Sequence, residues 1–256
     1  MYDLALQQAK ASPFTVVEIG VANGGSMQMW RQLLGPKARI IGIDLNPAIE
    51  NLVAEGFEVL VADMGLDEGW HRLAQLTGGP ESIDVLIDDG GHTNAQQIKA
   101  MVKGMPMVRP GGFLLIEDLH ASFMRKFGNP SRFSTWEFLL EILGDVQRCH
   151  GKSDSPVRYP KLTGQIDRMT FGTSIVAIQK RNSETFSTKS VTSGTDDSLG
   201  DYDHRWDSLS GNLLFRALSA ISSWSRHILS AQFLVVRFDS RREFRKGLRG
   251  ARSSHR

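Results

Sequence analysis

Five runs of apolar, mostly β-branched residues recur at intervals up to residue 118, separated by stretches with helical spacing of apolar residues. Near-continuous apolar runs are typical of strands that are covered on both faces, as in a parallel sheet. The runs span residues 14–19, 39–44, 57–63, 83–89 and 112–118, and the helical stretches span 24–34, 47–55, 67–77 and 94–107. This alternation predicts a doubly wound, Rossmann-like α/β sheet.

The pattern continues with a helix near 134–147 and a closing pair of strands at 166–170 and 174–179. We therefore expect residues 1–180 to form one α/β domain with a mostly parallel, seven-stranded sheet whose last strand is antiparallel. The hydrophobic share of 41% excludes a wholly disordered chain. The single cysteine, Cys149, excludes an intrachain disulfide and a thiolate metal cluster.

The last 76 residues of the 256 differ in composition from the domain before them. Residues 181–212 are rich in Ser, Thr, Asp and Gly, which predicts a flexible linker. Residues 213–256 carry a net charge of +8, although the whole chain carries only +2. Their apolar residues recur at helical spacing, which predicts a basic amphipathic helical tail. Contact with an anionic membrane surface, packing on the domain, and homo-oligomer formation remain alternatives for this tail. Without a signal peptide or membrane span, we expect a cytoplasmic protein.

Acidic residues stand at or near the carboxyl ends of all five runs. They are Glu18, Asp44, Asp63, the pair Asp88 and Asp89, and the pair Glu117 and Asp118. In an open α/β sheet the ligand crevice lies at this edge. Carboxylates gathered on one rim repel each other unless cations or hydrogen-bond donors lie between them. The sequence therefore predicts a ligand rich in hydroxyl and amine donors, together with a bound cation.

The turn after the first run contains Gly20, Gly24 and Gly25, which allow a sharp turn and a close approach to a ligand. It is not a Walker A loop, because Ser26 stands where the phosphate-binding lysine is required. It also lacks the second glycine of a dinucleotide-binding turn. Asp44 ends the second run, where an acid accepts hydrogen bonds from ribose hydroxyls. This combination favours a ligand that has a ribose but no phosphate.

Two motifs carry residues suited to catalysis: residues 88–92 (Asp-Asp-Gly-Gly-His) and residues 117–120 (Glu-Asp-Leu-His). Asp89, Glu117 and Asp118 offer oxygen ligands of the kind that Mg²⁺ prefers. His92 could act as a general base, because imidazole titrates near neutral pH. The alternative is structural: Asp88 and Asp89 would cap the helix that begins near residue 94, and Glu117 would form a buried salt bridge.

These motifs resemble those of a known family. Glu18, Gly20, Gly24, Ser26, Asp44, Asp63 and Asp88 are similar to the cofactor motifs of class I S-adenosylmethionine-dependent methyltransferases. Residues 18–30 (EIGVANGGSMQMW), 83–92 (IDVLIDDGGH) and 109–120 (RPGGFLLIEDLH) resemble the macrocin/mycinamicin-type sugar O-methyltransferases. The resemblance covers about residues 14–180, and it leaves the acceptor contacts of residues 121–160, among them Trp136, unassigned.

The resemblance implies a role for each matched residue. Glu18 and Gly20 would line the methionine end of the cofactor, with Asn23, Gly24 and Ser26 in the same turn. Asp44 would hold the ribose, Asp63 and Met64 the adenine, and Asp88 the amino or sulfonium region. Asp89, Glu117 and Asp118 would bind Mg²⁺ or a similar divalent cation, and His92 would be the general base.

The resemblance thus implies a Mg²⁺-assisted O-methyltransferase that acts on a sugar hydroxyl of a glycosylated metabolite, a glycolipid or a polysaccharide, as in secondary metabolite biosynthesis. Two alternatives stay open: an O-methyltransferase for a catechol-like small molecule, and a non-catalytic cofactor-binding scaffold. We expect no nucleic-acid partner, because the chain lacks a base-flipping methyltransferase motif and its basic charge lies outside the domain.

Overall fold

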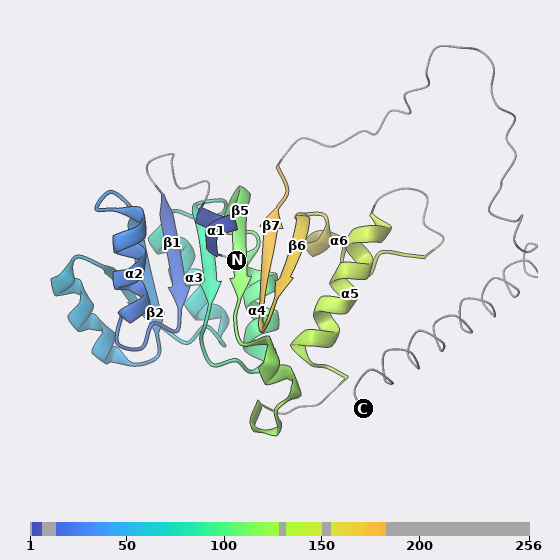
Figure 1. Ribbon diagram of the computed structural model, residues 1–256, viewed down its shortest axis with the longest axis horizontal. Coiled ribbons are helices and arrows are strands. Elements are labelled where there is room, and N and C mark those ends of the chain that lie inside the picture. The colour runs from blue at the N-terminus through green and yellow to red at the C-terminus, as the bar shows by residue number, and fades with distance from the viewer. Residues whose placement is uncertain (1, 7–13, 128–131, 150–154, 183–256) are drawn as a thin grey trace, which may run out of the picture. The chain divides into compact units, whose positions relative to one another are not determined.

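The computed structural model describes residues 2–6, 14–127, 132–149 and 155–182 (Figure 1). Its strands are β1 (Thr15–Ile19), β2 (Arg39–Asp44), β3 (Glu58–Val61), β4 (Ile83–Asp88), β5 (Val108–Ile116), β6 (Ile166–Gly172) and β7 (Ile175–Lys180). Its α-helices are α1 (Tyr2–Leu6), α2 (Gly25–Leu34), α3 (Asp67–Thr77), α4 (Asn94–Gly104), α5 (Thr135–Arg148) and α6 (Pro160–Thr163). The 3₁₀ segments are η1 (Pro47–Glu55), η2 (Leu119–Phe123) and η3 (Arg125–Phe127). The predicted linker and tail lie outside the described residues, apart from positions 181 and 182.

The strands form one seven-stranded sheet in the order β3-β2-β1-β4-β5-β7-β6. β1 to β5 pair in parallel, and β7 pairs antiparallel with both β5 and β6. The predicted Rossmann-like fold with an antiparallel last strand is therefore confirmed. The register aligns Ile19 with Asp88, and Asp88 with Ile116, so the residues that follow β1, β4 and β5 meet at one edge.

Alternate residues of the central strands enter two separate cores, one on each face of the sheet. Val17 and Leu86 pack with residues of α3, α4 and α5, whereas Val16 and Ile87 pack with residues of α1, α2 and η1. Both faces of β1 and β4 are thus buried, which explains their near-continuous apolar runs. No helix among the described residues is long and apolar enough to cross a membrane.

Two predicted elements differ in detail. Residues 47–55 form a 3₁₀ segment rather than an α-helix: Asn46 accepts a hydrogen bond from the Ala48 N–H, and the buried Ile49 and Leu52 are three residues apart, as 3₁₀ geometry requires. β5 begins at Val108 instead of residue 112. Its register with β4 shifts between Ile83 and Val85, which lets the strand continue through its glycines.

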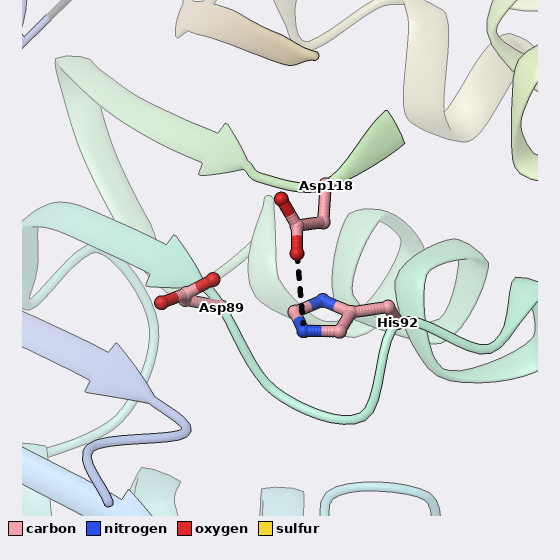
Figure 2. Close-up of side chains that lie close together, drawn as sticks. All are labelled: Asp89, His92 and Asp118. Atoms are coloured by element: carbon pink, nitrogen blue, oxygen red, sulfur yellow. Dashed lines mark ion pairs between the residues drawn. The ribbon is translucent and has the colours of Figure 1, made fainter. Parts of the chain in front are cut away.

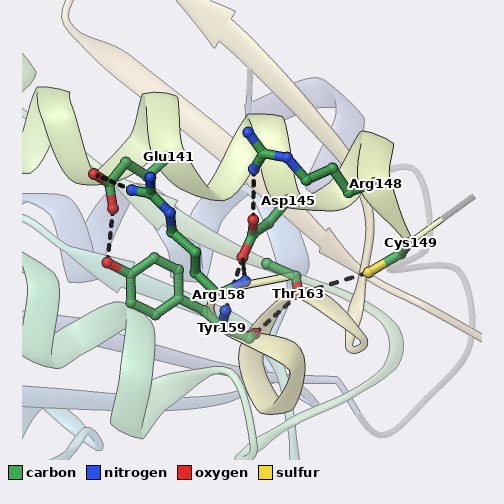
Figure 3. Close-up of polar contacts among 7 residues, drawn as sticks. All are labelled: Glu141, Asp145, Arg148, Cys149, Arg158, Tyr159 and Thr163. Carbon is green, nitrogen blue, oxygen red and sulfur yellow. Dashed lines mark hydrogen bonds and ion pairs between the residues drawn. The ribbon is translucent and has the colours of Figure 1, made fainter. Parts of the chain in front are cut away.

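A buried carboxylate fixes the segment that leads into α6 (Figure 3). Asp145 on α5 is fully buried and accepts hydrogen bonds from the backbone N–H groups of Arg158 and Tyr159, each at 2.7 Å. Arg148 also donates to Asp145, at 2.7 Å. Burial alone would raise the pKa of Asp145, but these hydrogen bonds hold the pKa below its usual value. Asp145 therefore joins α5 to the residues that lead back into β6.

We predict that Asp145→Ala lowers the free energy of unfolding by about 3 kcal/mol, because it leaves two backbone N–H groups without their acceptor. Urea unfolding followed by circular dichroism measures this change. Glu141→Gln is the matched control: the partly exposed Glu141 pairs with Arg158 at 3.0 Å, where an ion pair contributes less than about 1 kcal/mol, and glutamine can still accept the hydrogen bond that the Tyr159 hydroxyl donates.

The stabilisation by Asp145 has a defined pH dependence. Because the folded-state pKa is lowered, the stabilisation is complete above the unfolded-state pKa of about 4 and is lost as the pH falls through the folded-state value. The deficit of the alanine variant should therefore shrink in acid. A deficit that stays constant between neutral and strongly acidic pH would contradict this role.

Candidate cofactor cavity and metal cluster

The turn after β1 and the loop after β4 are in close contact at the carboxyl edge of the sheet. Gly20 has φ +88°, and a Cβ there would lie 2.3 Å from the carbonyl oxygen of Asp89. The Asp89 N–H donates to the Ile19 carbonyl at 2.9 Å, and the Gly20 N–H donates to the Ile43 carbonyl at 2.7 Å. Only glycine fits at position 20, and this contact sets how closely the acids of neighbouring strands approach.

A cavity of about 310 Å³ opens beside this contact. Five of the predicted cofactor residues line it: Gly20, Asp44, Asp63, Met64 and Asp88. The predicted metal ligand Asp89 lines it as well, so this cavity adjoins the predicted metal ligands. Three other lining residues, Leu45, Trp70 and Gln96, belong to no motif that sequence analysis could recognise.

Backbone N–H groups orient the two carboxylates at the β2 and β3 ends of the cavity. Asp44 accepts from the N–H groups of Ala22 at 3.0 Å and Asn46 at 2.9 Å. Asp63 accepts from the Gly65 N–H at 2.7 Å. These hydrogen bonds hold each acid in one position before any ligand arrives, which lowers the entropic cost of binding.

The other four predicted cofactor residues, Glu18, Asn23, Gly24 and Ser26, do not line this cavity. Glu18 is buried and accepts a hydrogen bond from Trp30 Nε1 at 2.9 Å. Burial, together with the charges of Asp89 and Glu117, raises the pKa of Glu18 to about 7. Gly24 has φ +77° and precedes α2, while Asn23 is exposed. Glu18 thus joins β1 to α2, and Gly24 shapes the turn between them.

Asp88 presents an unsatisfied acceptor in the cavity wall. Its side chain is 4% exposed, and its Oδ2 has no hydrogen-bond partner among the described residues. Burial raises its pKa to about 6, and the charges of Asp89 and Glu117 contribute to the shift. A buried carboxylate in this state is stabilised by a cationic or amine donor, so the wall fits a ligand with a positive charge near Asp88.

Asp89, His92 and Asp118 come together from two loops, as Figure 2 shows. Each offers one ligand atom, and these atoms all lie within 4.8 Å of one another. His92 Nε2 is 3.4 Å from Asp118 Oδ2, whereas its buried Nδ1 lacks a partner in the described structure. Two carboxylates at this spacing fit a divalent cation of the Mg²⁺ or Mn²⁺ type, and the imidazole beside them can serve either as a further ligand or as a base.

The backbone is strained at two members of this cluster. His92 has φ +55° and Asp118 has φ +53°, in the left-handed region that non-glycine residues seldom adopt. Such conformations cost about 1–3 kcal/mol each and persist only where the surrounding structure enforces them. They turn both side chains toward the same space beyond the ends of β4 and β5.

Glu117, the third predicted metal ligand, is bound to a residue that sequence analysis missed. The hydroxyl of Tyr2, on α1, donates a hydrogen bond to Glu117. The Tyr2 ring packs edge-on against Trp30 with 5.0 Å between centroids. Burial and the charges of Asp89 and Asp118 raise the pKa of Glu117, and the Tyr2 hydrogen bond partly opposes this rise.

The structural alternative for these acids is wrong for the helix cap and finds no support for Glu117 among the described residues. Thr93 caps α4: its hydroxyl accepts from the Gln96 N–H, and the Gln96 side chain binds back to the Thr93 backbone. Asp88 and Asp89 are therefore not used as helix caps. Within the described part of the chain, Glu117 receives its hydrogen bond from Tyr2 and forms no salt bridge with a cationic side chain.

Comparison with known proteins finds similarity to methyltransferases. Residues 17–119 match the model of a methyltransferase-domain family. The chain is 32% identical over 135 residues to the 8-demethyl-8-(2-methoxy-alpha-L-rhamnosyl)-tetracenomycin-C 3'-O-methyltransferase of Streptomyces olivaceus, covering 50% of this chain and 33% of that protein. It is 29% identical over 184 residues to the mycinamicin VI 2''-O-methyltransferase of Micromonospora griseorubida, covering 67% of this chain and 44% of that protein.

Among solved structures, the methyltransferase MycE of the mycinamycin pathway, in complex with Mg, SAH and mycinamycin VI, shares the fold. Its TM-score is 0.61 at 24% identity, over 71% of this chain and 48% of that one. The chain thus spans less than half the length of each of these three proteins. Residues 17–119 thus carry a methyltransferase domain, and the strand order and the acidic edge are those of the class I S-adenosylmethionine-dependent type. The chain resembles the macrocin/mycinamicin-type sugar O-methyltransferases at 29–32% identity.

Proposed function

We propose that this chain is a Mg²⁺-assisted O-methyltransferase that transfers a methyl group from S-adenosylmethionine to a sugar hydroxyl of a glycosylated acceptor. The observation that carries the proposal is the position of the Asp89, His92 and Asp118 cluster directly beside the cavity lined by Asp44 and Asp88. A methyl donor in the cavity and a hydroxyl at the cluster would meet at Asp89, which belongs to both.

The cavity residues would bind and orient the cofactor. Asp44 would accept hydrogen bonds from the two ribose hydroxyls, and Asp63 from the adenine amino group, with Met64 packed beside the base. Asp88 would face the amino or sulfonium charge, which would supply the partner that its buried Oδ2 lacks. Glu18, Gly20, Asn23, Gly24 and Ser26 would form the turn around the methionine end.

His92 would act on the acceptor. When bound, S-adenosylmethionine supplies the electrophilic methyl group, and the divalent cation lowers the pKa of the acceptor hydroxyl. His92 Nε2 would accept the hydroxyl proton as the oxygen bonds to the methyl carbon and the sulfonium C–S bond breaks. Asp89, Glu117 and Asp118 would hold the cation, with Glu117 leaving its Tyr2 hydrogen bond or sharing it.

The acceptor class is inferred from the relatives. Those named above are O-methyltransferases for rhamnosylated tetracenomycin and for mycinamicin VI, which favours a glycosylated natural product. A glycolipid or polysaccharide offers the same sugar hydroxyls, and a catechol-like molecule offers two adjacent hydroxyls to the same cation. The cytoplasmic location, the membrane contact of the tail and self-association remain predictions from the sequence.

A methyl-transfer assay tests the proposal. The full chain is incubated with methyl-labelled S-adenosylmethionine and Mg²⁺ and with paired probes: p-nitrophenyl and methyl α-L-rhamnosides, the corresponding glucosides, and catechol. Formation of a labelled glycoside in the presence of Mg²⁺, and its loss when Mg²⁺ is chelated from the reaction, supports the proposal. Transfer to catechol alone would favour the small-molecule alternative. Cofactor binding without transfer to any probe would favour the scaffold.

We predict that Asp44→Asn weakens binding of S-adenosylhomocysteine about 10- to 100-fold, because hydrogen bonds to a charged group contribute about 1.5–3 kcal/mol. Isothermal titration calorimetry of the folded variant measures the change. Asp67→Asn is the matched control, since Asp67 is exposed, does not line the cavity, and pairs with two lysines of α4 at 3.3 and 3.4 Å. Equal affinity of the two variants would remove Asp44 from the cofactor site.

A second prediction tests the ligand set. Asp89→Asn and Glu117→Gln should each weaken Mn²⁺ binding at least tenfold in electron paramagnetic resonance titrations, because each removes an anionic oxygen ligand. His92→Ala should change Mn²⁺ affinity less than threefold while abolishing methyl transfer, as expected of a base. The reverse ranking, with His92 essential for Mn²⁺ and Glu117 dispensable, would instead make His92 a ligand and Glu117 a partner of Tyr2 alone.

A further inference from the structure

Three aromatic side chains from separate elements gather near the end of β5. Phe123 of η2 lies with its ring centroid 6.0 Å from that of Trp136 on α5, and Trp136 lies 5.9 Å from Phe171 on β6. Phe123 is 61% exposed and Phe171 is 36% exposed, while Trp136 is half-buried. We call Phe123, Trp136 and Phe171 the aromatic shelf.

Hydrogen bonds hold the three elements of the aromatic shelf together. The Trp136 N–H donates to Ser122 Oγ at 3.2 Å, which ties the start of α5 to η2. The Leu119 N–H donates to the Ser174 carbonyl at 2.9 Å, and His120 Nδ1 lies 2.6 Å from Ser174 Oγ. These contacts tie η2 to the turn between β6 and β7. The shelf is therefore built in advance, so a ligand that lies on it would not have to order it.

The shelf is continuous with the Asp89, His92 and Asp118 cluster. η2, which carries Phe123, begins at the residue after Asp118. His120, on the same segment, has its Nδ1 3.7 Å from Asp118 Oδ1. The ring of His92 packs edge-on against Phe127 of η3 at 6.1 Å. The chain thus passes directly from the polar cluster to the exposed rings.

Exposed rings at such a place indicate a ligand with an apolar part. A contiguous exposed apolar patch that is rimmed by polar residues marks a ligand-binding or interaction site. An acceptor that places one sugar hydroxyl at the cluster must extend its remaining atoms over the neighbouring surface. Aromatic rings there suit the flat apolar face of an aglycone, which offers them a larger apolar area than the C–H face of a single sugar ring does.

We propose that the aromatic shelf binds the apolar, ring-containing aglycone of the acceptor and so selects glycosides of apolar aglycones over simple sugars. This inference rests on the proposed function and narrows its acceptor class. Substitutions in the aromatic shelf should change the choice of acceptor without altering the cofactor cavity or the metal cluster. An experiment can therefore test this inference separately from the proposed function.

The test uses the full chain with S-adenosylhomocysteine and Mg²⁺ in isothermal titration calorimetry. The probes are p-nitrophenyl and methyl α-L-rhamnoside and the corresponding pair of glucosides. The wild-type chain should bind the p-nitrophenyl member at least fivefold more tightly, which corresponds to one aromatic contact. Trp136→Leu and Phe171→Leu should reduce this preference to less than twofold without weakening the methyl glycoside. Trp136→Phe should keep most of it.

Leu33→Ala is the control, because Leu33 is 60% exposed near the end of α2, at the opposite edge of the sheet from the cluster. It should leave the preference unchanged. Equal binding of both members by the wild-type chain, or an unchanged preference in both leucine variants, overturns the inference while methyl transfer to glycosides still supports the proposed function. Absence of binding and of transfer for every glycoside overturns both.

The same variants give different results if another molecule occupies the aromatic shelf. If a second copy of the chain covers it, Trp136→Leu lowers the sedimentation coefficient and leaves the glycoside preference intact, which overturns the inference. Tighter binding of catechol than of any p-nitrophenyl glycoside, lost in Trp136→Leu, also overturns it, because the shelf would then hold the reacting ring instead of an aglycone.

Discussion

Electrostatic repulsion among carboxylates at one edge of the sheet is the constraint on which this site depends. Parallel register brings the ends of β1, β4 and β5 together, and Gly20 lets the loops after β1 and β4 touch. Burial and mutual charge raise the pKa values of Glu18, Asp88, Asp89 and Glu117. A fold that concentrates negative charge in this way is stabilised by ligands that bring positive charge and hydrogen-bond donors.

The fold and the acidic residues of the cavity could be predicted because they depend on local patterns. Apolar runs buried on both faces predicted β1 to β5, and the acid after each run predicted where Asp44, Asp63 and Asp88 would meet. Chain direction and sheet topology suffice for this step, since the carboxyl ends of parallel strands share one edge.

The parts that could not be predicted depend on contacts distant in sequence. Tyr2 binds Glu117 across 115 positions, and no local pattern marks either residue as the partner of the other. Trp30 and Glu18 pair through the packing of α2 on β1. The aromatic shelf joins residues of three elements, so only the packed structure reveals it. The 3₁₀ form of residues 47–55 was missed because α-helical and 3₁₀ spacing are alike over so short a segment.

Diffraction from crystals grown with S-adenosylhomocysteine and Mn²⁺ tests the central claim most directly, that the acidic edge is a joint cofactor and metal site. The account predicts an anomalous difference peak between the carboxylates of Asp89 and Asp118, with the ribose hydroxyls at Asp44 in the same cavity. A manganese peak at another acidic surface, or S-adenosylhomocysteine bound away from Asp44 and Asp88, would contradict it.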